Sequence, residues 1–159
     1  MIVVADSSPL HYLILIGQTE VLPTLFHRVV IPEAVRSELT DRFAPASVDR
    51  WIRNPPQWLD LRLAPTESPL ALESLDKGER EAISLAREMR ADYLLADDLR
   101  ARLEAERQHL VVIGTIGILQ RASSSGLLDF DRAFLELAQT NFRMSPAFRK
   151  SITDRSKQK

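Results

Sequence analysis

The stretch YLLADDLRARLEAERQHLVVIGT, residues 93–115, contains one complete unit of the predicted fold. It begins with a short apolar segment, residues 93–96, of the kind that forms a buried strand. A helix is expected over residues 99–108 and a second apolar strand over residues 110–113. A helix that joins two strands in this way is typical of a parallel pair, because the chain must return along the sheet before the second strand begins. The unit therefore predicts a parallel sheet covered by helices.

The same alternation continues towards both ends of the chain. Further strands are predicted over residues 2–5, 28–31 and about 58–64. In the first helix, Ser8 is the predicted N-cap, Pro9 the first helical residue and Gly17 the stop. A short helical or irregular link is expected at 21–26, and the other helices are predicted over residues 32–40, 46–54, 76–90, 115–126, 130–139 and 145–153. This order favours a single α/β domain whose sheet is covered on both faces.

Length and composition narrow the class of protein. The 159 residues fit one domain, residues 1–152, and 45% of them are hydrophobic, which is enough for a packed core. The absence of cysteine excludes disulfides and thiolate metal sites and fits a cytoplasmic location. No signal peptide is predicted, and the longest strongly apolar run, residues 10–17, is too short to span a membrane.

Basic residues are concentrated near the end of a chain whose net charge is −1. Six basic residues and one acid lie between Arg143 and Lys159. Residues 153–159 are predicted to form a basic C-terminal tail. This end of the chain is either a solvated segment or a docking segment for an acidic partner or RNA.

Several acidic residues occupy positions where a parallel sheet builds its site. Asp6 directly follows the first predicted strand, and Asp97 and Asp98 directly follow the strand at 93–96. Ligands of such sheets bind at the carboxyl ends of the strands. Glu38 borders the buried stripe of its helix, and Glu79 begins the helix that precedes Asp97. Their joint placement at one end of the sheet favours a shared site.

Each of these acids also has a purely structural interpretation, which the sequence leaves open. These interpretations are a helix cap for Asp6, a capping box with Asp76 for Glu79, a helix cap for Asp98 and an ion pair with Arg42 for Glu38.

Carboxylates gathered in one cleft repel one another, and a bound divalent cation compensates for that repulsion. Oxygen ligands without cysteine or zinc-type histidine spacing select a hard ion, Mg²⁺ or Mn²⁺. Carboxylate-held Mg²⁺ usually serves phosphate chemistry, so a metal-dependent phosphodiester hydrolase is expected.

An ordered set of motifs resembles the PIN-domain (PilT N-terminus) nucleases, and most closely their small prokaryotic branch related to VapC-type toxins. The motifs are a strand ending in DSS, the helix PEAVRSEL, LDKGEREAI, a strand ending in DD, VIGTIGIL and the ending NFRMSPAFRKSI. The resemblance implies a three-layer α/β/α sandwich with a central parallel five-stranded sheet. It also implies a Mg²⁺- or Mn²⁺-dependent endoribonuclease, often a homodimer and often held inactive by an antitoxin.

Carried over by position, the resemblance assigns five catalytic acids. Asp6, Glu79 and Asp97 are expected to coordinate the metal, and Glu38 and Asp98 to hold further waters or a second ion. A water activated there would attack the phosphorus of the RNA. The sequence LLADD replaces the Thr and Asn more typical of the toxins around the last acid, which bears on substrate detail more than on the metal site.

Four further residues are expected to support this site. Ser8 and Thr115 match polar positions that orient ligands or a phosphate oxygen. Arg100 and Arg102, on the helix after Asp98, are candidates for contacts with the RNA backbone, or else belong to a solvated helix face.

Two other functions are alternatives to the nuclease. A haloacid-dehalogenase-type phosphatase needs a second Asp two positions after the first, where this chain has Ser8. A non-cleaving RNA- or protein-binding module on the same scaffold stays open. An Asp6→Asn variant distinguishes these functions: unchanged cleavage of RNA by this variant would count against the metal-dependent nuclease.

Overall fold

The computed structural model describes residues 1–66, 72–144, 147, 150, 151 and 154. Five strands form one parallel sheet in the order β3-β2-β1-β4-β5. The strands are β1 (Val3–Ala5), β2 (Val29–Pro32), β3 (Leu59–Arg62), β4 (Tyr93–Leu95) and β5 (Val112–Ile113). The parallel sheet predicted from the sequence is confirmed.

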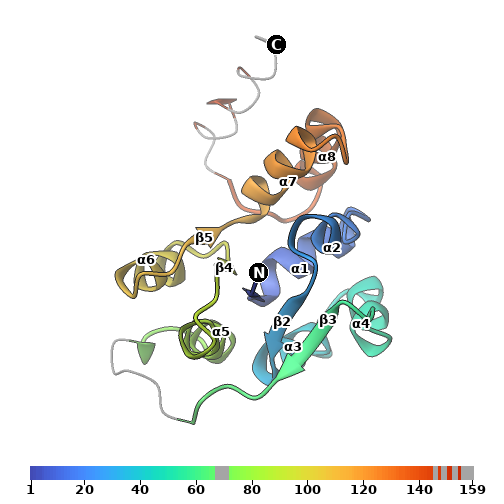
Figure 1. Cartoon of the computed structure of the whole chain (residues 1–159). Coiled ribbons are helices and arrows are strands. Elements are labelled where there is room, and N and C mark those ends of the chain that lie inside the picture. The colour runs from blue at the N-terminus through green and yellow to red at the C-terminus, as the bar shows by residue number, and fades with distance from the viewer. Residues whose placement is uncertain (67–71, 145–146, 148–149, 152–153, 155–159) are drawn as a thin grey trace.

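Helices connect the strands and cover both faces of the sheet. They are α1 (Ser7–Leu15), α2 (Val21–Phe26), α3 (Glu33–Leu39), α4 (Ala46–Arg53), α5 (Lys77–Glu88), α6 (Leu99–Arg107), α7 (Thr115–Ser124) and α8 (Phe130–Ala138). Figure 1 shows α5 and α6 on one side of the sheet and α1, α2, α7 and α8 on the other, which is the predicted three-layer α/β/α arrangement. The predicted last helix and basic tail lie mostly outside the described residues.

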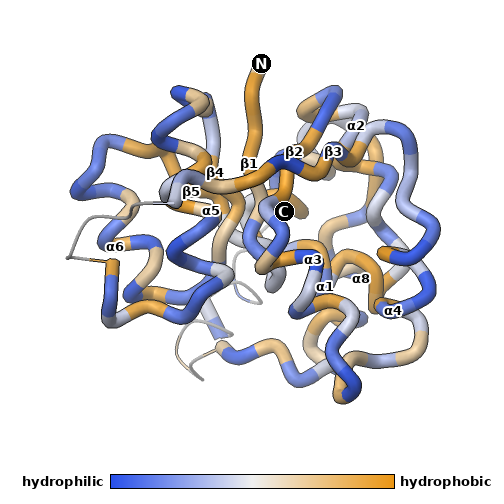
Figure 2. Tube along the Cα trace, turned by 90° about the horizontal axis from the view of Figure 1, so that it is seen from below, coloured by the Kyte–Doolittle hydropathy of each residue, from blue (hydrophilic) through white to orange (hydrophobic). Residues whose placement is uncertain are grey.

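The central strands are buried because their residues are apolar on both faces. All three residues of β1 and all four of β2 are buried. Figure 2 shows hydrophobic residues along these strands and hydrophilic residues on the outer turns. In the described part of the chain, no helix combines the length and apolar character that crossing a membrane requires.

The start of α1 differs from the sequence prediction. The N-cap is Asp6, whose side chain accepts a hydrogen bond from the backbone N–H of Ser7, so the prediction of Ser8 as the cap is wrong. Ser8 lies inside the helix, and its hydroxyl is free to bond elsewhere. The predicted stop at Gly17 is confirmed: this glycine has a φ of +69°, and the next N–H, of Gln18, bonds to the carbonyl of Leu13.

Candidate active site

The sheet brings the ends of β1 and β4 together. These strands are neighbours with Ala5 opposite Leu95, and the N–H of Asp6 donates to the carbonyl of Leu95 at 2.8 Å. Asp97 lies two residues after Leu95, the last residue of β4. The two acids therefore leave the sheet from adjacent strands at the same edge, as the sequence predicts.

Asp97 is held by three hydrogen bonds from two elements. The N–H of Thr115 donates to Oδ1 at 2.7 Å, and the Thr115 hydroxyl donates to Oδ2 at 2.6 Å. The Ser8 hydroxyl also donates to Oδ2, at 2.9 Å. Thr115 is completely buried as the first residue of α7. We call Ser8, Asp97 and Thr115 the Asp97 network, and its carboxylate has one fixed orientation.

Glu38 is held in a comparable way by α1 and α5. Its Oε2 accepts a hydrogen bond from the Ser7 hydroxyl at 2.5 Å, and its Oε1 accepts one from the N–H of Gly78 at 3.1 Å. A Cβ at Gly78 would overlap the Glu38 carboxylate, so the close approach needs a glycine there. The alternative ion pair with Arg42 is wrong, because that guanidinium lies over the ring of Phe43 instead.

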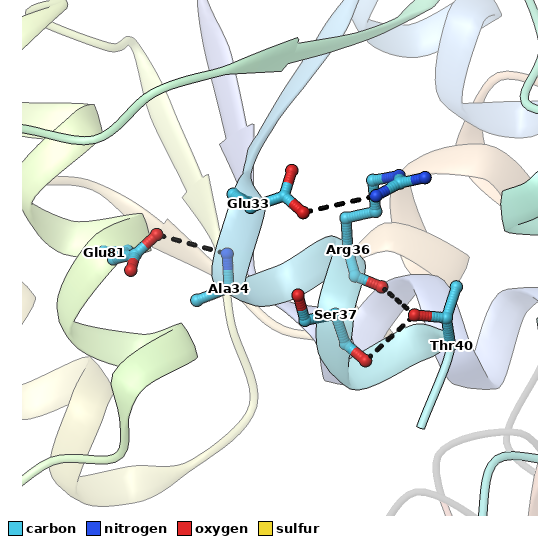
Figure 3. Close-up of polar contacts among 6 residues, drawn as sticks. All are labelled: Glu33, Ala34, Arg36, Ser37, Thr40 and Glu81. Carbon is cyan, nitrogen blue, oxygen red and sulfur yellow. Dashed lines mark hydrogen bonds and ion pairs between the residues drawn. The ribbon is translucent and has the colours of Figure 1, made fainter. Parts of the chain in front are cut away.

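A second contact between α3 and α5 fixes the helix that carries Glu38. Figure 3 shows Glu81 of α5 accepting a hydrogen bond from the N–H of Ala34, in the first turn of α3, at 3.2 Å. At the other end of α3, Thr40 closes the helix by donating to the carbonyls of Arg36 and Ser37. Glu38 is therefore carried by a helix whose start is joined to α5 and whose end is capped by Thr40.

Asp6 combines its role as a cap with an unusual charge environment. Its side chain is almost wholly buried, with a relative exposure of 4%. Burial, together with the negative charges of Glu38, Asp76 and Glu79, raises its pKa to about 8. The hydrogen bond from Ser7 opposes this rise but is too weak to cancel it. The carboxyl of Asp6 thus carries a proton at neutral pH unless a cation compensates it.

Glu79 forms the capping box that the sequence left open. Its backbone N–H donates to Asp76, and its own carboxylate accepts from the N–H of Asp76. Burial, followed by the charges of Asp76 and Asp98, raises the pKa of Glu79 to about 7. The pKa of Glu38 is also raised, chiefly by burial, and Asp76 and Glu81 contribute. Glu79 therefore forms the capping box and also adds its charge to the acidic region around Asp6.

Asp76 is the acidic residue that sequence reasoning missed as part of the site. It was interpreted only as a helix cap, yet its charge raises the pKa of Asp6, Glu38 and Glu79. A signal was present, because a cap at the start of the helix that carries Glu79 must lie beside it. We call Asp6, Glu38, Asp76 and Glu79 the acid cluster.

The pair Asp97–Asp98 divides its roles. Asp98 is exposed and caps α6 by accepting a hydrogen bond from the N–H of Ala101 at 3.1 Å. Its charge still contributes to the raised pKa of Glu79.

Of the two candidate arginines, Arg102 lines a cavity together with Asp97, whereas Arg100 is exposed.

The donor set suits a hard cation, since it consists of carboxylate oxygens. In the described residues, however, no three acidic or histidine side chains are already arranged to hold one ion. In this arrangement the Glu79 carboxylate is bonded to the N–H of Asp76, and the Asp97 carboxylate to Ser8 and Thr115.

Comparisons with known proteins agree with the fold. A family model described as PIN domain matches residues 2–158. Among solved structures, the fold is similar to a PilT N-terminus domain protein from the hyperthermophilic archaeon Sulfolobus solfataricus P2. The TM-score is 0.52 at 16% sequence identity, over 91% of this chain and 100% of the archaeal one. No curated protein matches the sequence.

Proposed function

Because the chain belongs to the PIN-domain family, we propose that it is a divalent-metal-dependent endoribonuclease. The observation that supports this proposal is the acid cluster. Four carboxyl groups from the ends of β1, α3 and α5 share one region, and three of them have raised pKa values. This concentration of negative charge destabilises the protein unless it serves to bind a cation.

The residues proposed to hold Mg²⁺ or Mn²⁺ are Asp6, Glu79 and Asp97, with Glu38 and Asp98 beside them. When bound, the ion supplies a water of lowered pKa and stabilises charge on the phosphate oxygens. Ser8 and Thr115 keep the Asp97 carboxylate in one orientation, so that it does not reorganise during the reaction. Ser7 and Gly78 do the same for Glu38.

The test compares the wild type with Asp6→Asn on labelled RNA in the presence of Mn²⁺. We expect the variant to lose about 100-fold or more of the cleavage rate, because a catalytic metal contributes several kcal/mol. Asp49→Asn is the matched control: it makes the same Asp-to-Asn change at a half-buried position on α4, outside the candidate site, where Asp49 pairs with Arg53. Cleavage that persists in Asp6→Asn would refute the proposal. Binding of RNA without any cleavage by the wild type would support the binding module instead.

We also propose that the protein is the toxin of a toxin–antitoxin pair and forms a homodimer, because the sequence resembles the VapC-related branch. Growth arrest on expression, relieved by a small protein encoded next to it, is the expected result. Expression without growth arrest would count against the toxin role and leave the nuclease chemistry untouched. The mass of the purified protein in solution tests the homodimer.

A further inference from the structure

A large cavity lies next to Asp97 at the β5 edge of the sheet. Its volume is about 1150 Å³, and its lining comes mainly from α6, β5, α7 and residues 142–144, with further residues from α2, the start of β4 and Met1. Figure 1 shows β5 running between α6 and α7 at this edge. We call this cavity the basic groove, for the residues described next. It opens beside the Asp97 network and so continues from the candidate active site.

Three arginines line the basic groove. They are Arg102 from α6, Arg121 from α7 and Arg143 from the segment after α8. Within the described lining, Asp97 is the single acidic residue, so positive charge exceeds negative charge there. Arg102 and Arg143 form no ion pair with any described residue, and Arg121 lies over the ring of Tyr93 at 5.0 Å. In a chain of net charge −1, this is a local concentration of positive charge.

The rest of the lining is suited to bases. Ile113, Ile116 and Phe142 provide apolar surface, and Gln120 and Ser124 provide hydrogen-bonding groups. The Phe142 ring packs edge-on against Tyr12, at 5.0 Å between centroids, which holds it in place. Aromatic and apolar surface beside arginines is the combination that binds single strands, because unpaired bases stack on it while the phosphates meet the cations. A duplex keeps its bases stacked inside and offers mainly phosphates and sugar hydroxyls.

We propose that the basic groove binds a single-stranded segment of RNA, with its phosphates along Arg102, Arg121 and Arg143, and leads it to Asp97. This inference rests on the proposed ribonuclease function and adds the path that the substrate takes along this chain's own residues. The path runs along the β5 edge, at the end of the sheet opposite β3.

Binding measured without metal separates this inference from catalysis. Fluorescence anisotropy of a labelled 12-nucleotide RNA in EDTA gives the affinity at several salt concentrations. The groove variant carries Arg102→Ala, Arg121→Ala and Arg143→Ala. The control variant carries Arg50→Ala, Arg53→Ala and Arg87→Ala, which remove the same charge from exposed positions outside the groove.

We expect the groove variant to bind at least about 10-fold more weakly at low salt, with its salt slope smaller by about 2, because each lost phosphate contact removes about 0.7. The control variant should keep the wild-type slope. Lysine at the same three groove positions should retain most of the slope, since it keeps the charges. Phe142→Leu should weaken binding without changing the slope, because stacking does not depend on salt. Thermal melting verifies that each variant is folded.

Three results would overturn the inference. These are a groove variant that binds like the control, a duplex of the same sequence that binds as tightly as the single strand, and a wild type that binds no RNA in EDTA. Failure of the proposed function looks different: the wild type would bind single strands through the groove and cut none of them when Mn²⁺ is added. If a groove variant cleaves RNA at the wild-type rate and binds it with the wild-type affinity, the ribonuclease function stands and the proposed path through the groove is refuted.

Discussion

The two parts of the candidate site differ in how their charge is compensated. In the Asp97 network, three donors from Ser8 and Thr115 satisfy one carboxylate. In the acid cluster, burial and neighbouring negative charges raise the pKa values of three of the four carboxyl groups. Fewer donors face each of them, two at Glu38 and one each at Asp6, Asp76 and Glu79. The carboxylate of the Asp97 network is preorganised, whereas the acid cluster holds excess negative charge.

This difference indicates which side would respond to a cation. A carboxylate that is already satisfied keeps its position whether or not a metal is bound. Asp6 and Glu79, whose pKa values are raised to about 8 and about 7, must instead hold protons or a cation near neutral pH. We therefore expect changes in the acid cluster to alter the dependence on pH and metal, and changes in the Asp97 network to alter geometry and stability.

The largest expected effect is on the pH dependence of stability. The folded state keeps the Asp6 proton up to about pH 8, whereas the unfolded chain releases it near the ordinary value of 3.8. In EDTA, the free energy of unfolding should therefore fall as the pH rises through this window, by on the order of 5 kcal/mol for this group alone. Urea unfolding of the wild type and Asp6→Asn between pH 4.5 and 9 measures it.

Asp6→Asn should lack this decline, because the amide does not titrate. Glu79 and Glu38, whose pKa values are also raised, contribute a decline of the same sign in both proteins. Saturating Mn²⁺ should stabilise the wild type more than the variant above pH 7. Identical pH profiles for the two proteins would contradict the charge environment described for Asp6.

Gly78→Ala tests how tightly the acid cluster is packed. The new Cβ would overlap the Glu38 carboxylate, so that side chain must move and lose its bonds to Ser7 and Gly78. We expect a loss of roughly 1–3 kcal/mol in urea unfolding and a large loss of cleavage.

Gly114→Ala is the matched change in the other part of the site. There the added Cβ would lie 3.0 Å from Oδ1 of Asp97 and 3.1 Å from Nη1 of Arg102, so these atoms would have to move by only a few tenths of an ångström. The smaller effect is therefore expected at Gly114. Equal effects of the two substitutions would contradict the contrast in packing.

Thr115→Val tests the Asp97 network. It removes the hydroxyl that donates to Oδ2 while keeping the shape of the side chain. We expect about 1 kcal/mol lower stability and a roughly 10- to 100-fold loss of metal affinity or cleavage. Thr115→Ser, which keeps the hydroxyl, should restore most of both. A serine variant as impaired as the valine variant would contradict the assignment of the effect to the hydroxyl.

The neighbouring serines provide the finest comparison. Ser7→Ala removes a bond that lowers the pKa of Glu38, so that pKa should rise further and the cleavage profile should shift to higher pH. Ser8→Ala removes one of three donors to Asp97 and should lower the rate without such a shift. Each change should cost about 1 kcal/mol or less in stability. If Ser7→Ala and Ser8→Ala give the same pH profile of cleavage, the two parts of the site do not differ in their effect on pH dependence.

Much of the architecture could be predicted from local patterns. The strands at 93–96 and 110–113 and the helix between them were recognisable because burial on both faces demands runs of apolar residues. The capping box of Asp76 and Glu79 and the stop at Gly17 are also local features. The start of α1 was misplaced by two residues because Asp6, Ser7 and Ser8 all have the chemistry of a cap.

The sequence by itself determined the order of strands and helices and placed acids at the carboxyl ends of β1 and β4. Only the tertiary structure decided which serine serves which acid, because the bonded residues are 31 positions apart for Ser7 and Glu38 and 89 apart for Ser8 and Asp97. It also added Asp76 to the acid cluster and distinguished Arg102 in the groove from Arg100 outside it. Periodicity and capping act over a few residues, whereas these contacts depend on how distant elements pack against one sheet.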